Sequence, residues 1–335
     1  MSVWAEEILY NVTLKRVAVG LLESPLTIHN PAYQLFYRRQ MKTVMEKYHN
    51  APRQVMIENT NACNYTCSFC PHQKMRRKIG LMRFELYKKI IDECSEIGIA
   101  HVDIHQFGEP LLDRFFIDRI IYAKNRGIKT VLTNTNGVLL SEELAGDLIR
   151  SGLDLVVISI DAATQETYKI VRPSGHLGTV EKNVRNLVKM KRTVGSSRPT
   201  VVLDFLQTPE NRDESGRFIK KWKGIADKIC VSYMHDWASS VEVEGKVLDF
   251  HGHAYREPCR LLWTDLVISW DGRVPLCCID FENEVILGNV ENSSIWQVWH
   301  DGPMSKVRRA HLDAKFRDIP LCARCSYRST WWAVW

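Results

Sequence analysis

Residues 63–70 read CNYTCSFC and place Cys63, Cys67 and Cys70 in a C-x3-C-x2-C spacing directly after a candidate strand, Val55–Glu58. Three thiolates on one loop suit an iron–sulfur cluster, and three ligands rather than four leave one iron open to a small molecule. The alternative is a structural zinc site in which His72 supplies the fourth ligand. The spacing therefore predicts a metal-binding loop at the end of the first strand.

Outward from this loop, short apolar runs alternate with longer amphipathic segments about six times. This alternation predicts a parallel sheet covered by helices. Six units are fewer than the eight of a closed barrel, so we expect an α/β fold that is a partial (β/α)6 TIM-like barrel. The expected strands are Val55–Glu58, His101–His105, Thr130–Thr133, Leu155–Ser159, Val201–Leu206 and Lys228–Tyr233. The expected helices are Arg83–Ile97, Leu112–Asn125, Ser141–Ser151, Val180–Thr193 and Asp213–Ile225.

Three segments are expected along the chain: an N-terminal helical extension at residues 1–51, the barrel at 52–250, and a small C-terminal module at 251–335. In the module, Leu266–Trp270 and Arg273–Cys277 flank an Asp-Gly turn and predict a hairpin. One helix is expected at Ile295–Arg309. The tail at residues 330–335 contains three tryptophans, which we expect to pack on the protein's own surface or at a dimer interface, with a lipid contact as the alternative.

The composition favours a cytoplasmic protein without nucleic-acid or membrane partners. No run approaches the ~20 apolar residues of a membrane span, and the N-terminus does not resemble a signal peptide. The net charge of the 335 residues is +6. The densest basic run, Lys74–Lys78, is interpreted as a solvated or anion-facing loop because no aromatic-interleaved basic stripe accompanies it. In a reducing compartment, ten cysteines indicate metal ligation rather than disulfides.

The loop motif in this β/α context resembles that of the radical S-adenosylmethionine (SAM) superfamily, including the aromatic at Phe69. The resemblance implies a 4Fe–4S cluster whose open iron chelates SAM, and reductive cleavage of SAM to methionine and a 5′-deoxyadenosyl radical. The family fold is the partial (β/α)6 barrel, in agreement with the strand count. A closed, water-poor barrel interior suits such a radical.

Further residues resemble the family's SAM contacts. Gln106–Pro110 (QFGEP) is similar to the G-G-E-P element, with Phe107 in place of the first glycine but with Gly108 and Glu109 kept. The resemblance implies that the Glu109 carboxylate accepts a hydrogen bond from the SAM amino group. By the same resemblance, the ribose or carboxylate groups of SAM are expected to contact Ser159, Asp161 and Arg172. The alternatives are that Ser159 and Asp161 cap a helix and that Arg172 is a surface charge.

A second group of cysteines resembles the SPASM/twitch extension of a subset of radical SAM enzymes. Cys259-x12-Gly272-x4-Cys277 resembles its opening, and Cys322 and Cys325 form a C-x2-C pair. The resemblance implies one auxiliary 4Fe–4S cluster with these four ligands, and the G-x4-C spacing selects Cys277 over Cys278. A structural zinc ribbon is the alternative.

An auxiliary cluster with four protein ligands cannot bind SAM, so we expect it to transfer electrons. Dehydrogenation would use it to accept an electron after hydrogen abstraction, whereas epimerisation would need a thiol to return hydrogen. Cys230, in the sixth strand, is a candidate donor, and the alternative is a buried structural cysteine. By strand position, the candidate acid–base residues are His105, Asp204 and His235.

The expected substrate is a small polar molecule, a sugar or aminocyclitol, with a peptide or protein as the alternative. A flavodoxin- or ferredoxin-type protein is the expected reductant. A hypothesis from another class is a non-catalytic zinc-binding interaction module.

Overall fold

The computed structural model describes residues 30–241 and 258–325. A seven-stranded sheet is its centre, with strand order β6-β5-β4-β3-β2-β1-β7, and every neighbouring pair is parallel. The predicted partial (β/α)6 barrel is confirmed, and its sheet contains one strand more than the six that were predicted. The strands are β1 (Gln54–Ile57), β2 (His101–Asp103), β3 (Thr130–Thr135), β4 (Leu155–Ser159), β5 (Thr200–Gln207), β6 (Lys228–Tyr233) and β7 (Asp265–Ile268).

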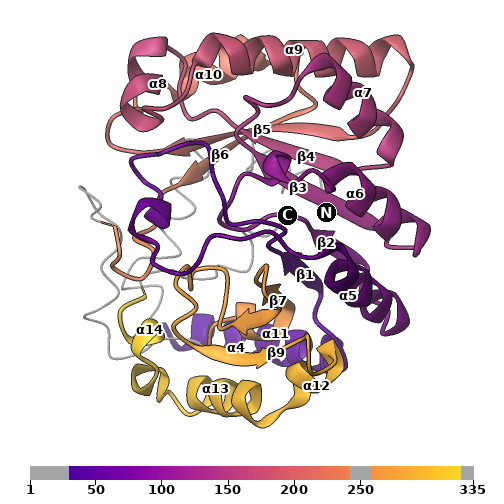
Figure 1. Ribbon diagram of the computed structural model, residues 1–335. Coiled ribbons are helices and arrows are strands. Elements are labelled where there is room, and N and C mark those ends of the chain that lie inside the picture. Colours follow the sequence, from indigo (N-terminus) through magenta and orange to yellow (C-terminus); the bar gives the residue numbers. More distant parts are fainter. Residues whose placement is uncertain (1–29, 242–257, 326–335) are drawn as a thin grey trace.

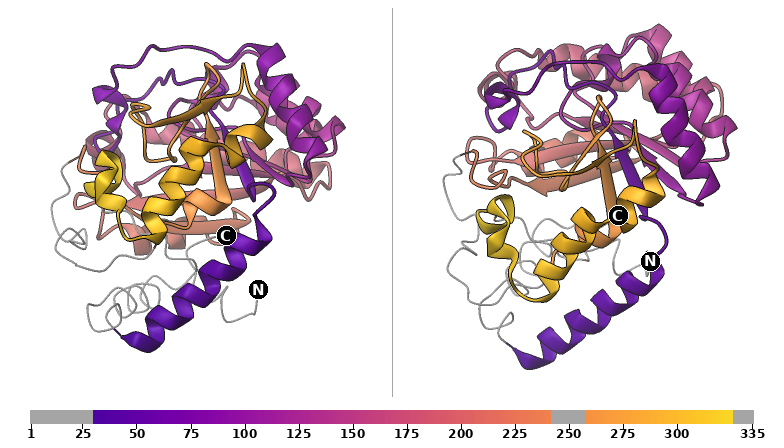
Figure 2. Two further views of the ribbon diagram at one scale, coloured as in Figure 1. Left: turned by 90° about the horizontal axis from the view of Figure 1, so that it is seen from below. Right: turned by 60° about the horizontal axis from the view of Figure 1, so that its bottom comes forward.

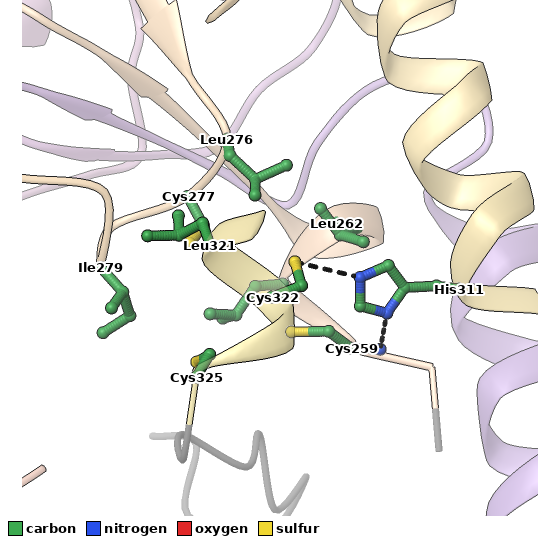
Figure 3. Close-up of a pocket in the computed structure, with 10 residues that line it drawn as sticks. Cys259, Leu262, Leu276, Cys277, Ile279, His311, Leu321, Cys322 and Cys325 are labelled. Atoms are coloured by element: carbon green, nitrogen blue, oxygen red, sulfur yellow. Dashed lines mark hydrogen bonds between the residues drawn. The ribbon is translucent and has the colours of Figure 1, made fainter. Parts of the chain in front are cut away.

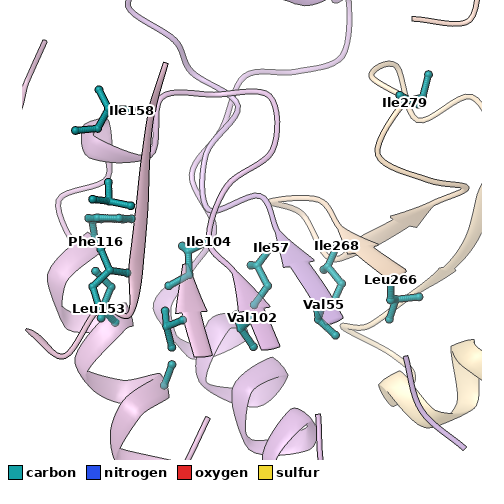
Figure 4. Close-up of a cluster of buried hydrophobic side chains, with 14 of the residues drawn as sticks. Val55, Ile57, Val102, Ile104, Phe116, Leu153, Ile158, Leu266, Ile268 and Ile279 are labelled. Atoms are coloured by element: carbon teal, nitrogen blue, oxygen red, sulfur yellow. The ribbon is translucent and has the colours of Figure 1, made fainter. Parts of the chain in front are cut away.

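Helices follow the strands and cover the outer face of the sheet (Figure 1). They are α5 (Phe84–Glu96), α6 (Phe116–Asn125), α7 (Glu142–Ser151), α8 (Gln165–Val171), α9 (Leu177–Thr193) and α10 (Ser215–Trp222). Alternate strand residues point to opposite faces, which separates a helix-facing set from an inner set. Val55, Ile57, Val102 and Ile104 belong to the first set and are fully buried (Figure 4). The core therefore lies between sheet and helices, and the inner face is left for polar residues.

The C-terminal module is built differently from our expectation. β7 pairs with β1 in the large sheet, whereas β8 (Arg273–Pro275) pairs antiparallel with β9 (Ile286–Asn289). The tight turn is present, with Gly272 at φ +83° and the Ser269 amide donating to Arg273 O, but the expected hairpin pairing is wrong. β-Branched and apolar residues in β7 fit a buried parallel position as well as a hairpin, so local pattern could not separate the two.

The expected single helix at Ile295–Arg309 is two helices, α12 (Ile295–His300) and α13 (Gly302–Leu312). Pro303 lies in the first turn of α13, where its missing N–H costs nothing, but it could not continue α12. Short helices α11 (Leu261–Thr264) and α14 (Pro320–Ala323) complete the module.

The predicted N-terminal helix is represented by α4 (Pro31–Lys47), which lies beside the C-terminal module (Figure 2). The Tyr37 hydroxyl donates to Pro258 O at 2.9 Å, and the Trp299 indole donates to Tyr48 O at 3.2 Å. This part of the extension therefore packs on the module. Residues 1–29, the expected boundary at 250/251 and the Trp-rich tail lie outside the described residues.

Within the described ranges, no helix combines the length and apolar character that a membrane crossing needs. The basic run Lys74–Lys78 differs in part from the expected solvated loop. The Arg77 side chain is buried and forms a bidentate ion pair with Glu58, which directly follows β1. This pair fastens the loop to the sheet.

Candidate functional site

The loop after β1 carries the three clustered cysteines. It runs from the end of β1 to a short 3-10 helix, η1 (Pro71–Lys74). The Cys70 amide donates to Cys67 O at 3.2 Å. The Cys67 thiol contributes electrostatically to the pKa of both Cys63 and Cys70, and Cys63 contributes to that of Cys70, so the structure brings the three thiols together.

The chemistry of this group fits an iron–sulfur cluster. Burial raises the pKa of Cys63 to about 11 and that of Cys70 to about 12, and it also raises the pKa of Cys67. Ligation needs thiolates, and iron supplies the positive charge that crowded, buried thiolates otherwise lack. In the described part of the chain, no group of three His, Cys, Asp or Glu side chains forms a site for a single metal ion. His72, the expected zinc alternative, has Nε2 within 2.7 Å of Asn61 O.

Gly108 and Glu109 lie directly against the cysteine loop. A Cβ at Gly108 would stand 2.3 Å from Thr60 O and 2.6 Å from Ala62 O, so only glycine allows this approach. The Glu109 amide donates to Ala62 O at 2.8 Å. The G-E-P motif alone does not reveal this packing role of Gly108.

The Glu109 carboxylate is buried and held by three donors. Oε1 accepts from the Thr135 hydroxyl at 2.6 Å and the Leu111 amide at 3.1 Å, while Oε2 accepts from the Asn136 amide at 2.8 Å. Burial raises the pKa of Glu109, and these hydrogen bonds oppose that shift. The carboxylate is thus rigidly oriented beside the cysteine loop, as an amino-group acceptor would need to be.

Asp161 and Arg172 pair with each other, which we did not expect. Both Nε and Nη2 of Arg172 donate to Asp161 Oδ2, and Asp161 Oδ1 accepts from the Leu206 amide. Arg172 is not a surface charge, because it is buried, and Asp161 is not the N-cap of α8, because Thr164 takes that position. Burial alone would lower the pKa of Arg172, but Asp161 and Cys67 hold it well above its usual value.

The Arg172 guanidinium also lies 5.6 Å from the Phe69 ring centroid and 5.9 Å from that of Tyr65. It therefore connects the end of α8 to the cysteine loop through cation–π contacts. Contacts of Phe69, Asp161 and Arg172 with SAM stay predictions.

Removal of the buried Asp161–Arg172 ion pair should lower the stability of the protein. Asp161→Asn keeps the shape and a side chain that tolerates the φ of +62° at this position, but leaves the Arg172 charge without its counter-ion. We expect the free energy of unfolding to fall by about 3–5 kcal/mol, measured by urea denaturation in one fixed metal state. Asp147→Asn, which removes an exposed pair with Arg150, is the matched control and should change stability by under about 0.5 kcal/mol. Equal stability of the two variants would contradict the assigned role of the pair.

Three predicted residues share the inner face of neighbouring strands. Ser159 in β4 is opposite Asp204 in β5, and Asp204 is opposite Cys230 in β6. The flanking Leu203 and Phe205 are buried against the helices, so Asp204 and Cys230 point the other way. The Ser232 hydroxyl donates to Asp204 Oδ2 at 2.9 Å. The sheet thus presents an acid, a thiol and two hydroxyls in one patch, which we call the β4–β6 patch.

His105 and His235 follow strands β2 and β6 and lie outside the strand pairing that defines this patch. His105 follows β2, with Nδ1 3.7 Å from Asp103 Oδ2. His235 follows β6 and packs edge-on against Trp237 with ring centroids 4.2 Å apart. Burial lowers the pKa of His235 to about 4. Their catalytic roles stay predictions.

All four cysteines predicted for the second cluster line one pocket in the C-terminal module (Figure 3). Cys259 precedes α11, Cys277 follows β8, and Cys322 and Cys325 come from α14 and its end. Its apolar walls are formed by Leu261, Leu262, Leu276, Ile279 and Leu321. Burial raises the pKa of Cys277 well above its usual value, and the neighbouring thiols add to the shift. The donor set and the dry walls fit an iron–sulfur cluster.

Cys277 lines this pocket, and its neighbour Cys278 is not among the lining residues. The backbone of Cys278 instead contacts the barrel, because the Gln106 amide donates to Cys278 O at 2.9 Å. This arrangement favours the choice of Cys277 that the spacing indicated.

A segment that we did not foresee connects the two groups of cysteines. The Trp237 indole donates to Phe69 O at 3.2 Å, next to Cys70. Two residues on, the Ser239 hydroxyl donates to Arg324 O at 3.0 Å, next to Cys325. Trp237, Ala238 and Ser239 all have positive φ, an unusual run that bends the chain between the two loops. No sequence motif signals this turn.

Comparison with known families agrees with these two sites. The model of the radical SAM superfamily matches residues 57–218, which include the cysteine loop, Glu109 and Arg172. The model described as the SPASM iron–sulfur cluster-binding domain matches residues 259–326, which include all four pocket cysteines.

Among curated proteins, a tungsten-containing aldehyde ferredoxin oxidoreductase cofactor-modifying protein from Pyrococcus furiosus is 30% identical over 158 residues. The match covers 46% of this chain and 44% of that protein. The chain thus spans about half the length, or less, of the first curated relatives it matches.

Two solved structures share the fold. BtrN in complex with AdoMet and 2-DOIA has a TM-score of 0.55 at 17% identity, over 82% of this chain and 93% of that one. SuiB from Streptococcus suis, bound to the precursor peptide SuiA, has a TM-score of 0.63 at 16% identity, over 88% and 78%. From the two family matches and this shared fold, the chain belongs to the radical SAM superfamily and carries a SPASM-type iron–sulfur domain at its C-terminal end.

Proposed function

We propose that the protein removes a hydrogen atom from a small polar substrate, a sugar or an aminocyclitol, and completes a dehydrogenation or an epimerisation. Family membership implies a SAM-binding 4Fe–4S cluster and an auxiliary iron–sulfur cluster. When bound, the first cluster and SAM supply the one-electron chemistry that makes a hydrogen-abstracting radical. A flavodoxin- or ferredoxin-type protein is the proposed electron donor.

Cys63, Cys67 and Cys70 would hold the first cluster, and Glu109 would accept a hydrogen bond from the SAM amino group. Three donors already fix the Glu109 carboxylate, so it needs no reorganisation to bind a cation. Ser159, Asp161, Arg172, Phe69 and Gly108 complete the proposed SAM site. The Asp161–Arg172 pair would contribute by holding the loop and the end of α8 together.

The β4–β6 patch is the observation that carries the proposed reaction. Asp204 can accept the proton of a substrate hydroxyl, and the Ser232 hydroxyl keeps its carboxylate oriented. Cys230, directly opposite Asp204, can return a hydrogen atom. A carboxylate beside a thiol suits a carbinol substrate, because the carbinol carbon can lose a hydrogen atom to the radical while its hydroxyl loses a proton to the carboxylate, and the auxiliary cluster would take the remaining electron.

Cys259, Cys277, Cys322 and Cys325 would hold the auxiliary cluster, whose proposed role is to take or return one electron. Support for a small substrate comes from the shared fold of BtrN, which was crystallised with the aminocyclitol 2-DOIA. The alternative substrate is a peptide or protein, favoured by the likeness to SuiB in complex with its precursor peptide.

Deuterium transfer tests the proposal directly. With SAM, dithionite and sugars or aminocyclitols deuterated at carbinol carbons, we expect deuterium in 5′-deoxyadenosine for at least one substrate. A peptide panel run in parallel tests the alternative. Transfer from peptides only would overturn the small-substrate proposal.

Cys230→Ala separates the two reactions. If the product is an epimer, the variant should still move deuterium into 5′-deoxyadenosine but yield no epimer, because the returning hydrogen is missing. Dehydrogenation should be almost unchanged. Cys94→Ala, which removes a fully buried thiol from α5, is the control for loss of a cysteine.

A further inference from the structure

His311 lies between two of the four cysteines of the auxiliary pocket. It projects from α13, is 1% exposed, and is one of the residues that line the pocket. The Cys259 amide donates to His311 Nδ1 at 3.2 Å, and His311 Nε2 is 3.3 Å from Cys322 Sγ (Figure 3). Both ring nitrogens are therefore engaged by ligand residues.

The first of these contacts determines the second. Nδ1 accepts a backbone N–H, so it carries a lone pair and no proton. In a neutral imidazole the proton is then on Nε2, which makes Nε2 the donor and the Cys322 sulfur the acceptor. The backbone of one ligand residue thus fixes the tautomer that bonds to the sulfur of another.

The ring is also held in position from its own helix. One turn earlier, the Arg308 side chain donates from Nε to Leu262 O at 2.9 Å and from Nη1 to Trp299 O at 2.8 Å. Its guanidinium stacks over the Trp299 ring at 4.0 Å. These contacts fasten α13 to α11 and α12, and the Cys259 amide at Nδ1 keeps the ring turned with Nε2 toward the sulfur.

The apolar surroundings increase the effect of this hydrogen bond on the cluster. Leu262, Leu276 and Leu321 line the same pocket, and in such apolar surroundings a hydrogen bond is electrostatically stronger than in water. Reduction adds one negative charge to a cluster and its thiolates. A donor at sulfur therefore stabilises the reduced form more than the oxidised form, and hydrogen bonds to the sulfurs are a known determinant of cluster potential.

We propose that His311 is a positioning residue that donates Nε2–H to the Cys322 thiolate and raises the reduction potential of the auxiliary cluster. The inference rests on the auxiliary cluster itself and not on the proposed substrate. Failure of the deuterium experiment would leave it intact, and its own failure would leave the substrate proposal intact.

Redox titration of the full-length protein with both clusters, followed by EPR, tests the proposal. Addition of SAM should perturb only the signal of the cluster with an open iron, which identifies the auxiliary signal. His311→Phe keeps the ring but removes the donor. We expect its auxiliary midpoint potential to become more negative by about 59 mV, which corresponds to a tenfold weaker one-electron reduction.

Two variants make the result specific. His311→Gln places an amide N–H near the position of Nε2 and should recover most of the shift. His300→Phe changes a histidine of α12 that contacts Asn50 O and does not line the pocket. The auxiliary midpoint potential of this variant should therefore match that of the wild type. An unchanged potential in His311→Phe with full iron content would overturn the proposal.

Loss of about four irons from both His311 variants would also overturn it, since the imidazole would then be required to hold the cluster. A measurement on the unaltered protein guards against a Phe variant that fails to fold. With ¹⁵N-histidine labelling, pulsed EPR should detect one histidine nitrogen weakly coupled to the auxiliary cluster, and this coupling should vanish in His311→Gln. Absence of the coupling in the wild type contradicts the hydrogen bond.

Discussion

Cys67→Ala is expected to abolish SAM cleavage and to lower the iron content from about eight to about four per chain. Cys67 is buried in the middle of the loop, and its thiol is electrostatically coupled to Cys63, Cys70 and Arg172. Its two neighbours in the loop, Cys63 and Cys70, are themselves expected ligands, so neither can replace it. 5′-Deoxyadenosine formation with dithionite should fall to the background of the assay.

Cys94→Ala is the matched control for this experiment. Cys94 is fully buried in α5 and belongs to neither group of cysteines. Its replacement should reduce stability modestly, by about 1 kcal/mol, and leave iron content and SAM cleavage unchanged. A Cys67→Ala protein that retained about eight irons and produced 5′-deoxyadenosine would show that this loop is not the cluster site.

Substitution of Cys277, but not of the adjacent Cys278, should have the second large effect. Cys277→Ala removes one of four thiols around the pocket, so about four irons should be lost and substrate turnover should cease. SAM cleavage without turnover should persist, because the loop at Cys63–Cys70 is separate. Iron analysis, EPR and product analysis measure the three quantities on one preparation.

Cys278→Ala removes the same atoms one position further along and serves as the control. The Gln106 contact with Cys278 is to its backbone oxygen, so the substitution leaves it in place. We expect full iron content and turnover. The opposite result, with Cys278→Ala losing iron and Cys277→Ala keeping it, would reverse the ligand assignment.

Much of the barrel could be predicted from the sequence. β4 and β6 were predicted to the residue, and the other four strands to within a few residues, because buried parallel strands are short apolar runs bounded by turns. β7 was missed as a barrel strand because parallel pairing with β1 is a long-range contact. No local pattern encodes it.

The parts of the candidate site that belong to a local sequence motif could be predicted. Cysteine spacing marked both clusters, and the G-E-P element marked Glu109. The Asp161–Arg172 pair and His311 were not foreseen in their observed roles, for a common reason. Each acts through a partner far along the chain, Leu206 in one case and Cys259 in the other, and only the fold brings these partners together.

EPR of the anaerobically reconstituted, dithionite-reduced protein with and without SAM tests the central assignment most directly. The account predicts two 4Fe–4S signals, of which one changes when SAM is added because its cluster has an iron that the protein does not ligate. A single signal, a pair of signals that both ignore SAM, or a colourless zinc-loaded protein would contradict it.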